Sequence, residues 1–256
     1  MSEATVSRDE LIAYLDELLD AGASDDYGPN GLQVEGRPTI RRLVTAVSSC
    51  RELFVRARDA GADAVLVHHG IFWNGMPAVL TGVQYRRVRE LVEGGLNLIG
   101  YHLPLDRHPV YGNNALAARA FELVDVEPFA VCKGLPIGCK GRFPDPVSTA
   151  ELRRRCATIF GQDPLAFDEG PDPVKTLGIV SGGAQQDLYT AVADGLDAFL
   201  TGEASEWVMN VARESGIHYL AAGHYATERL GVRALGEHVA ERFGIAVEFL
   251  DVPNPV

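Results

Sequence analysis

The sequence has few cysteines, no basic run and no long apolar run, and each shortage excludes a class of protein. Four cysteines in 256 residues, irregularly spaced, are too few for a disulfide framework, so we expect reduced thiols. No stretch approaches the ~18 apolar residues that a membrane span needs. The N-terminal residues also lack the basic and apolar parts of a signal peptide. We therefore expect a cytoplasmic protein with no membrane partner.

The charge balance disfavours nucleic acid as a partner. Acidic residues number 35 against 23 lysines and arginines, which gives a formal net charge of −12. Binding to nucleic acid depends largely on clustered cations that neutralise phosphates, and no such cluster offsets the acidic excess. Nucleic acid is therefore not expected as a partner.

The hydrophobic pattern predicts an α/β fold. Length and a 46% hydrophobic content allow one large or two modest cores. Ser7 with Glu10 and Ser148 with Glu151 have capping-box spacing, so a helix is expected to begin at each serine. Short β-branched runs alternate with helical stretches, which is typical of parallel strands joined by crossover helices. The predicted strands are residues 42–48, 62–68, 96–102, 174–181, 197–202, 217–223 and 246–252.

A segment rich in Gly and Pro, residues 126–146, separates two runs of this pattern. It indicates a domain boundary followed by one or two strands. We predict domain 1 as residues 1–128, completed by the C-terminal segment 229–256, and domain 2 as residues 129–228. Both domains are expected to be α/β, with largely parallel sheets.

The two halves of the chain align with each other, which indicates an internal duplication. Three pairs of segments correspond: 42–48 with 175–181, 60–69 with 194–203, and 94–106 with 215–228. In this alignment His69 falls opposite Glu203, and His102 falls opposite His224. Polar side chains thus recur at the carboxyl ends of strands, where ligands bind in parallel α/β folds.

Imidazoles and carboxylates at these strand ends form a candidate metal site. His224 and Glu228 are four residues apart at a helix start, a spacing that presents two ligands to one metal. Mixed nitrogen and oxygen donors suit two divalent ions of iron, zinc, manganese, nickel or cobalt, with Glu228 as the bridging carboxylate. The complete predicted ligand set is His68, His69, Asp106, His224 and Glu228.

Structural roles are the alternative for these residues. His68 and His69 also fit two polar residues where a strand meets a loop, and Glu228 fits an acid favoured by a helix dipole. Trp73 and Trp207 follow polar strand ends. For both we expect a core or subunit-interface position rather than a place in the wall of a cleft.

Four motifs occur in order along the chain: HHGIFW (68–73), HLPLD (102–106), TGE (201–203) and GHYATE (223–228). With NGLQV (30–34) and YGNNALA (111–117), they resemble the NGG-interacting-factor-three-like family of dinuclear-metal proteins, also known as GTP cyclohydrolase I type 2. The resemblance covers nearly the whole chain. It implies two α/β domains with a dinuclear metal site in the cleft between them, and a toroidal homohexamer. The family's metal ligands carry over onto the five residues of the predicted set.

One motif departs from the family pattern. The family usually has His-Thr-Asn-Leu-Asp where this chain has His102-Leu-Pro-Leu-Asp106. Pro104 stiffens this loop. The change bears on any substrate contact made there, and leaves Asp106 available as a ligand.

The resemblance implies a metal-dependent hydrolase of the GTP cyclohydrolase kind, acting on a nucleotide as its small-molecule substrate. In this hypothesis a metal-bridging hydroxide opens the purine imidazole ring, and His102 or Glu203 transfers protons. Alternatively, Glu203 orients a metal-bound histidine, and His102 is a hydrogen-bonded structural histidine. The Ser181-Gly182-Gly183 segment either binds an anion through its amides or forms an ordinary turn.

A second hypothesis comes from a different class of function. The protein would be a non-catalytic metal carrier or a regulatory scaffold that handles metal or partner proteins without turnover. Metal-dependent conversion of a nucleotide separates the two hypotheses.

Overall fold

The computed structural model describes residues 4–256, which form two compact units. Unit 1 contains the chain up to Leu105 together with Gly231–Pro253, and unit 2 contains Asp106–Leu230 together with Asn254–Val256. Among the described residues, no helix is long and apolar enough to cross a membrane.

Unit 1 is built on a five-stranded sheet that is parallel except at one edge. Its strands are β2 (Gly31–Val34), β4 (Arg42–Ser48), β5 (Ala64–His69), β6 (Asn97–Gly100) and β13 (Ala246–Phe249), and a separate pair joins β1 (Val6–Ser7) to β3 (Thr39–Ile40). The order is β13-β4-β5-β6-β2, with only β2 antiparallel to its neighbour. The nearly continuous apolar runs in β4 and β5 suit strands that are buried on both faces.

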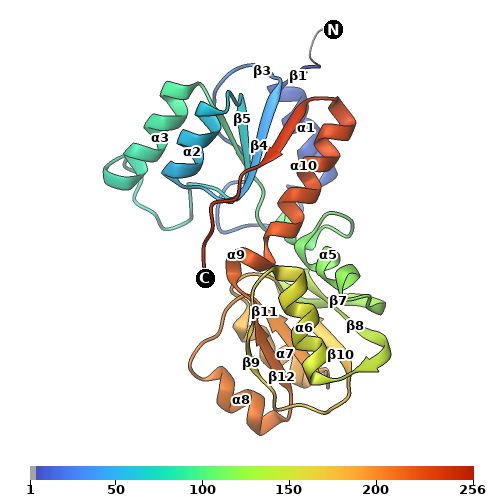
Figure 1. The fold of residues 1–256 in the computed structure, drawn as a ribbon. Coiled ribbons are helices and arrows are strands. Elements are labelled where there is room, and N and C mark those ends of the chain that lie inside the picture. The colour runs from blue at the N-terminus through green and yellow to red at the C-terminus, as the bar shows by residue number, and fades with distance from the viewer. Residues whose placement is uncertain (1–3) are drawn as a thin grey trace. The chain divides into compact units, whose positions relative to one another are not determined.

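Helices cover both faces of this sheet. They are α1 (Arg8–Leu18), α2 (Arg51–Asp59), α3 (Gly82–Gly94) and most of α10 (Arg229–Phe243). Figure 1 shows α2 and α3 against one face and α1 and α10 against the other. Phe54 of α2 and Leu91 of α3 share a core cluster with Val65 of β5. On the other face α10 packs closely at Gly236, where a Cβ would lie 2.8 Å from Cγ2 of Thr45.

Unit 2 is built on a six-stranded mixed sheet. Its strands are β7 (Val124–Cys132), β8 (Leu135–Val147), β9 (Leu165–Phe167), β10 (Val174–Ile179), β11 (Ala198–Thr201) and β12 (His218–Ala221). The order is β7-β8-β10-β11-β12-β9. Only β10, β11 and β12 pair in parallel, and the other pairs are antiparallel. The expectation of largely parallel sheets is therefore wrong for unit 2 and holds only for unit 1.

The hairpin of β7 and β8 accounts for this difference. Lys133 and Gly134 form its two-residue turn with φ angles of 52° and 82°, and Cys132 pairs with Leu135 across it. Two residues at positive φ make a turn whose twist suits antiparallel neighbours. The segment 126–146 thus contains strands, as predicted, but they form a hairpin inside unit 2, so the predicted domain boundary there is wrong.

The division between the units falls earlier than the predicted residue 128. Helix α5 (Asn113–Ala120) packs on β8 and β10, and its Ala117 shares a core cluster with Leu177. Because α5 and β7 bury their apolar side chains in unit 2, the first segment of unit 1 ends at Leu105 rather than at residue 128. The segment that returns to unit 1 is Gly231–Pro253, where we predicted 229–256.

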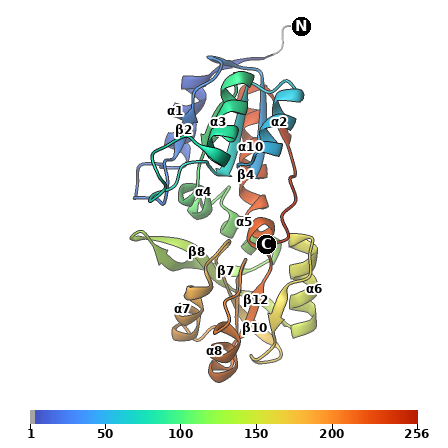
Figure 2. The same cartoon turned by 90° about the vertical axis from the view of Figure 1, so that its left-hand side faces the viewer.

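Helices also cover both faces of the second sheet. They are α5, α6 (Thr149–Phe160), α7 (Leu188–Ala193) and α8 (Val208–Ser215), with a short 3-10 helix η1 (Gln185–Asp187). Figure 2 shows α6 on one side of the sheet and α7 and α8 on the other.

Both predicted capping serines are confirmed. Ser7 Oγ accepts from the Glu10 N–H at 3.1 Å, and Ser148 Oγ accepts from the Glu151 N–H at 3.2 Å.

The two units share one order of elements. Without the small β1–β3 pair, α1-β2-β4-α2-β5-α3-β6 in unit 1 corresponds to α6-β9-β10-α7-β11-α8-β12 in unit 2. The same hydrogen bonds recur as well. Asp63 Oδ2 accepts from the backbone N–H of Arg42 at 3.2 Å, and Asp197 Oδ2 accepts from that of Thr176 at 3.1 Å. The shared contact supports the predicted duplication, but it matches Arg42 with Thr176, one residue beyond Lys175, which the sequence alignment placed opposite Arg42.

Replacing Asp63 by alanine should destabilise the protein by about 2 kcal/mol. The Asp63 carboxylate is buried and accepts from the backbone N–H groups of Arg41 and Arg42, which would lose their partner. Urea denaturation of the variant measures the change. Asp59→Ala, at an exposed carboxylate, is the control and should stay within about 0.5 kcal/mol of the wild type. Equal stabilities of the two variants would contradict this account.

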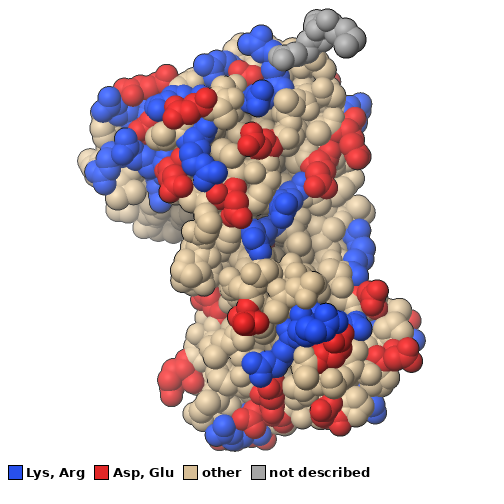
Figure 3. All heavy atoms as spheres, viewed as in Figure 1, with Lys and Arg blue, Asp and Glu red and all other residues tan. Residues whose placement is uncertain are grey.

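Acidic and basic side chains are interspersed on the face shown in Figure 3. Several form ion pairs on the surface of unit 1, such as Arg58 with Glu90 at 2.7 Å and Arg89 with Glu93 at 2.7 Å. The basic side chains on this face therefore lie among acidic ones rather than in a continuous tract.

Candidate metal-binding site

His68 and His69 end β5, between β4 and β6 in the sheet of unit 1. His68 is fully buried, and its Nδ1 lies 3.0 Å from the carbonyl oxygen of Tyr101. Because a carbonyl oxygen only accepts, Nδ1 of His68 carries the proton and Nε2 carries the lone pair. Nδ1 of the half-buried His69 lies 3.0 Å from Oγ of Ser48. Both imidazoles are thus oriented by hydrogen bonds at Nδ1.

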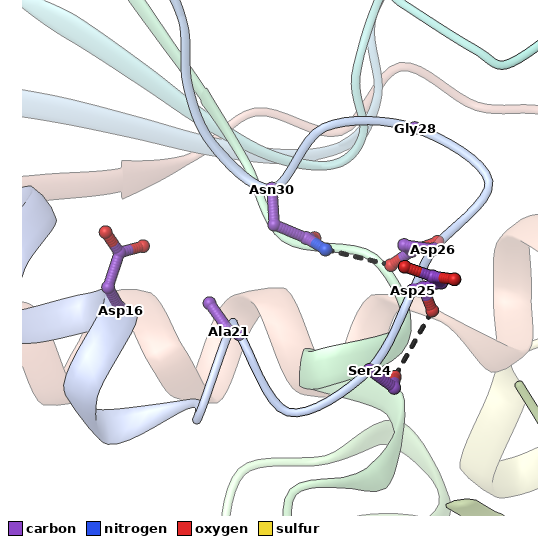
Figure 4. A pocket seen from close by; sticks show the side chains of 8 residues that line it. Asp16, Ala21, Ser24, Asp25, Asp26, Gly28 and Asn30 are labelled. Atoms are coloured by element: carbon purple, nitrogen blue, oxygen red, sulfur yellow. Dashed lines mark hydrogen bonds between the residues drawn. The ribbon is translucent and has the colours of Figure 1, made fainter. Parts of the chain in front are cut away.

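His102 follows β6 and joins these two histidines. One ring nitrogen from each of the three imidazoles lies within 4.8 Å of the others. His102 donates from Nδ1 to Oδ1 of Asp26 at 2.7 Å, and Asn30 donates to the other oxygen at 3.0 Å (Figure 4). Burial of Asp26 opposes its ionisation, but these hydrogen bonds and the charge of His102 hold the pKa of Asp26 below its ordinary value.

Asp26 also lies at the edge of an open acidic pocket. This pocket measures about 430 Å³ and is lined by Asp16, Asp25 and Asp26 among other residues (Figure 4). Asp16 is engaged elsewhere, since its carboxylate accepts from the Tyr101 hydroxyl at 2.6 Å. Asp26 thus both lines this pocket and accepts a hydrogen bond from His102.

Gln33 of β2 fixes the turn that follows β5. Its Oε1 accepts from the Ile71 N–H at 2.9 Å, and its Nε2 donates to the Pro29 carbonyl at 2.7 Å. The side-chain amide of Gln33 occupies the space that a side chain would need at either of two nearby glycines. A Cβ at Gly70 would lie 2.2 Å from Gln33 Nε2, and a Cβ at Gly100 would lie 2.8 Å from it. Gln33 thus ties the histidine turn to the loop that carries Asp26.

Gln33→Leu should weaken metal binding by about 10- to 100-fold, as is typical when a partner that orients ligands is lost. Leucine roughly retains the volume but leaves the Ile71 N–H and the Pro29 carbonyl without their partner. Zinc titration calorimetry measures the affinity. The exposed Gln186→Leu is the control, and equal affinities in both variants would show that Gln33 does not orient the histidines.

In unit 2, Asp106 lies in the short helix α4 (Leu103–Arg107) and is buried. Its Oδ1 accepts from Nδ2 of Asn113 at 2.8 Å and from Oγ of Ser181 at 3.1 Å. These two hydrogen bonds fix the orientation of the carboxylate.

His224 and Glu228 lie at the end of β12, where Gly223 with φ of 92° leads into the short helix α9 (His224–Thr227). His224 Nε2 and Glu228 Oε2 are 3.2 Å apart, and His224 Nδ1 lies 2.7 Å from Oε1 of Glu203. Burial disfavours the charged imidazole, but the hydrogen bonds and charges of Glu228 and Glu203 outweigh it and raise the pKa of His224 to about 9. Two potential metal-binding atoms therefore sit side by side.

The turn after β10 packs against this pair through glycine. A Cβ at Gly182, which has φ of +70°, would lie 2.3 Å from Glu228 Oε1 and 3.2 Å from His224 Nε2. The amides of this turn are already engaged. Ser181 N–H donates to Asn114 Oδ1 at 2.7 Å, and Gly182 N–H donates to Thr227 Oγ1 at 3.0 Å. These contacts favour the ordinary-turn interpretation over an anion site.

The tryptophans have different surroundings. The Trp73 ring lies edge-on to His102 at 5.1 Å and is 5.9 Å from the His69 ring, measured between centroids. It therefore flanks the imidazoles, and the subunit-interface position stays a prediction. Trp207 stacks on Tyr189, with ring centroids 5.2 Å apart.

Sequence reasoning missed the residues that orient the candidate ligands: Asp26, Gln33, Ser48, Asn113 and Ser181. For Gln33 and Asn113 a signal lay in NGLQV and YGNNALA, which entered only as part of the resemblance, whereas Asp26, Ser48 and Ser181 lie outside both segments. Neither segment has a spacing that indicates a metal site by itself, because hydrogen bonds to ligands come from distant parts of the chain.

Comparison with known proteins decides the family. The profile of Duf34/NIF3 (NGG1p interacting factor 3) matches residues 6–255, nearly the whole chain. The chain belongs to the Duf34/NIF3 family. This confirms the resemblance found in the four motifs.

Relatives of this Duf34/NIF3 chain are similar over their full length. A Pseudomonas aeruginosa protein named GTP cyclohydrolase 1 type 2 homolog is 43% identical over 245 residues, 96% of this chain and 97% of the relative. The solved structure of protein ybgI, of unknown function, has 41% identity and a TM-score of 0.93, and covers 98% of this chain and 100% of that one. The TTHA1606 protein from Thermus thermophilus has 39% identity and a TM-score of 0.89 at the same coverage.

Proposed function

We propose that this Duf34/NIF3 protein is a metal-dependent hydrolase of the GTP cyclohydrolase kind that acts on a nucleotide. Two divalent ions would be held jointly by the five predicted ligands, namely His68, His69, Asp106, His224 and Glu228. The name of its Pseudomonas aeruginosa relative supports the reaction class. The donor set supports the metals, because imidazoles and carboxylates together suit first-row divalent ions.

One observation carries the proposal. Each of the three predicted histidine ligands has its Nδ1 in a hydrogen bond, with the Tyr101 carbonyl for His68, Ser48 for His69 and Glu203 for His224. Metal-binding histidines almost always have their other ring nitrogen engaged in this way, which fixes the tautomer and the ring orientation. The turn at Gly182 also suits a bound metal, because a side chain at this position would occupy the space beside Glu228.

The chain's own residues would prepare the site for hydrolysis. Glu203 would hold His224 in the tautomer that leaves Nε2 for metal, which favours the orienting role over proton transfer. Asn113 and Ser181 would hold the Asp106 carboxylate in place. Bound divalent ions would supply Lewis-acid polarisation and lower the pKa of water.

A pocket in unit 2 supports a small-molecule substrate. The pocket has a volume of about 470 Å³. Asp106 is one of its lining residues, and most of the others are apolar, such as Pro128 and Ile137. Its size and apolar lining are those of typical small-molecule sites, and a flat heterocycle fits walls of this kind. We propose that the base of the nucleotide binds here.

Metal-dependent turnover tests the proposed function. Protein loaded separately with each candidate metal is incubated with GTP and other nucleotides, and products are identified by mass spectrometry. We expect a ring-opened product that has gained one water and forms only in loaded protein. No metal-dependent product from any nucleotide, with transfer of metal to an apo-acceptor, would overturn the hydrolase and favour the metal carrier.

We also propose that the chain assembles into a homohexamer. Large apolar side chains are exposed close together on unit 1, at Met76, Val79, Leu80, Val83 and Tyr85. An exposed apolar patch is typical of a surface that another chain covers. Light scattering should give six times the mass of one chain, and a monomeric mass would contradict the assembly.

A further inference from the structure

We infer that the segment 254–256 positions His224, because the backbone oxygen of Val256 caps the short helix that begins at this histidine. The inference rests on the proposed function in taking His224 as a metal ligand. It assigns a role to a segment that lies outside all the sequence motifs described above.

Val256 bonds to the residue that follows His224. The backbone N–H of Tyr225 donates to the backbone oxygen of Val256 at 2.9 Å, and Figure 1 shows this end of the chain beside α9. The first N–H groups of a helix have no acceptor within the helix, and the preceding Gly223 has no side chain to supply one. Tyr225 is buried, so its N–H needs an acceptor from elsewhere in the protein. Val256 provides that acceptor.

Unit 1 has the same contact at the corresponding position. In the internal alignment His102 falls opposite His224, and the next residue is Leu103. The Leu103 N–H donates to Oδ2 of Asp26 at 3.0 Å. The other oxygen of Asp26 accepts from Nδ1 of His102 at 2.7 Å. One carboxylate thus holds both the imidazole and the amide that follows it.

In unit 2 these two contacts are divided between two residues. Oε1 of Glu203 lies 2.7 Å from Nδ1 of His224, while the amide that follows bonds to Val256. Glu203 therefore takes over one contact of Asp26, and Val256 takes over the other. Because the pair of contacts recurs in both halves of a duplicated chain, both contacts belong to the means by which a histidine is held at this strand end.

The sequence of the segment suits this place. Pro253 and Pro255 restrict the backbone around Asn254 to extended conformations, which lowers the entropy that is lost when the segment docks. Oδ1 of Asn254 accepts from the Val256 N–H at 3.1 Å and so holds Val256 in a turn. Pro255 and Val256 also line a pocket of about 350 Å³ together with Glu203. The segment thus lies at the same pocket as the carboxylate that orients the histidine.

Deletion of residues 254–256 from the otherwise intact chain tests the inference. We expect cobalt(II) to bind about 10-fold more weakly and with changed visible absorption, as is typical when a contact that orients a ligand is lost. In metal-free protein, hydrogen exchange followed by mass spectrometry should be roughly 5- to 10-fold faster in the peptide that contains the Tyr225 amide, because this amide loses its acceptor.

Three point variants accompany the deletion. Val256→Ala is the matched control, because it keeps the backbone oxygen and changes a side chain that is 61% exposed, so it should alter neither measurement. Asn254→Ala removes the acceptor for the Val256 N–H and should change both measurements in the same direction as the deletion. Asn254→Asp retains an oxygen at that position and should restore wild-type behaviour.

The outcomes separate this inference from the proposed function. Unchanged cobalt affinity and absorption in the deletion variant would overturn the inference, whether or not exchange is faster, and would leave the proposed function standing if the wild type binds two ions. If the deletion variant loses its circular dichroism, the comparison of Asn254→Ala with Asn254→Asp decides in the same way. Absence of metal from the wild type would overturn both.

Discussion

Glu228→Ala is expected to reduce bound metal from two ions per chain to one or fewer, and to reduce metal-dependent turnover by at least about 100-fold. Glu228 is the proposed bridging carboxylate, buried with one oxygen 3.2 Å from His224 Nε2. Without the negative charge of the Glu228 carboxylate between the two dications, the ions would repel each other and would have no shared ligand. Elemental analysis gives the metal content, and product formation from GTP gives the turnover.

Glu214→Ala is the matched control for this prediction. Glu214 is an exposed acid on α8, so its removal changes the net charge equally and leaves the candidate ligands intact. The control should keep the wild-type metal content. If Glu228→Ala also keeps it, Glu228 does not bridge two ions.

Gly202→Ala should destabilise the protein by about 3 kcal/mol, the upper end for overpacking, because the clash is with backbone on two sides. A Cβ at Gly202 would lie 2.6 Å from His224 Cα and 2.7 Å from the Gly182 carbonyl oxygen. Neither can rotate away as a side chain would, so the His224 segment must move from the turn after β10. Thermal unfolding should show a fall in Tm of roughly 6–12 °C, with loss of metal binding.

Gly22→Ala provides the control for this substitution. Its Cβ would meet nothing within 4 Å, and its φ lies outside the region that favours glycine. This variant should be as stable as the wild type or slightly more so, because alanine restricts the unfolded chain. A Gly202→Ala protein that melts at the same temperature as Gly22→Ala would show that the strand end tolerates displacement.

The fold was predictable where local pattern and packing agree. The sequences of β4 and β5 contain nearly continuous apolar runs, and the capping serines Ser7 and Ser148 are followed by glutamates at the required spacing, so these elements form as predicted. Strands were predicted in the β7–β8 segment, but their pairing as a hairpin was not, because Lys133 must adopt a positive φ, which lysine seldom does. The boundary after Leu105 depends on which sheet α5 packs against, and no local pattern encodes that choice.

The types of residue that form the candidate ligands were predictable from the sequence, whereas the residues that hydrogen-bond to them were not. Strand ends with histidine and acid are visible in sequence, and the structure brings together His68 with His69 in unit 1 and His224 with Glu228 in unit 2. The contact of Asp26 with His102 joins residues that are 76 positions apart, and no spacing rule relates them. Such contacts arise from tertiary packing, so they appear only once the chain is folded.

The metal content of purified protein tests the central claim most directly. Elemental analysis should find about two divalent ions per wild-type chain, as the dinuclear proposal requires. We predict lower ratios in both His68→Ala and His224→Ala, one substitution in each unit, with His238→Gln unchanged. Ratios that stay at the wild-type value in both alanine variants would contradict the ligand assignment and the dinuclear site built on it.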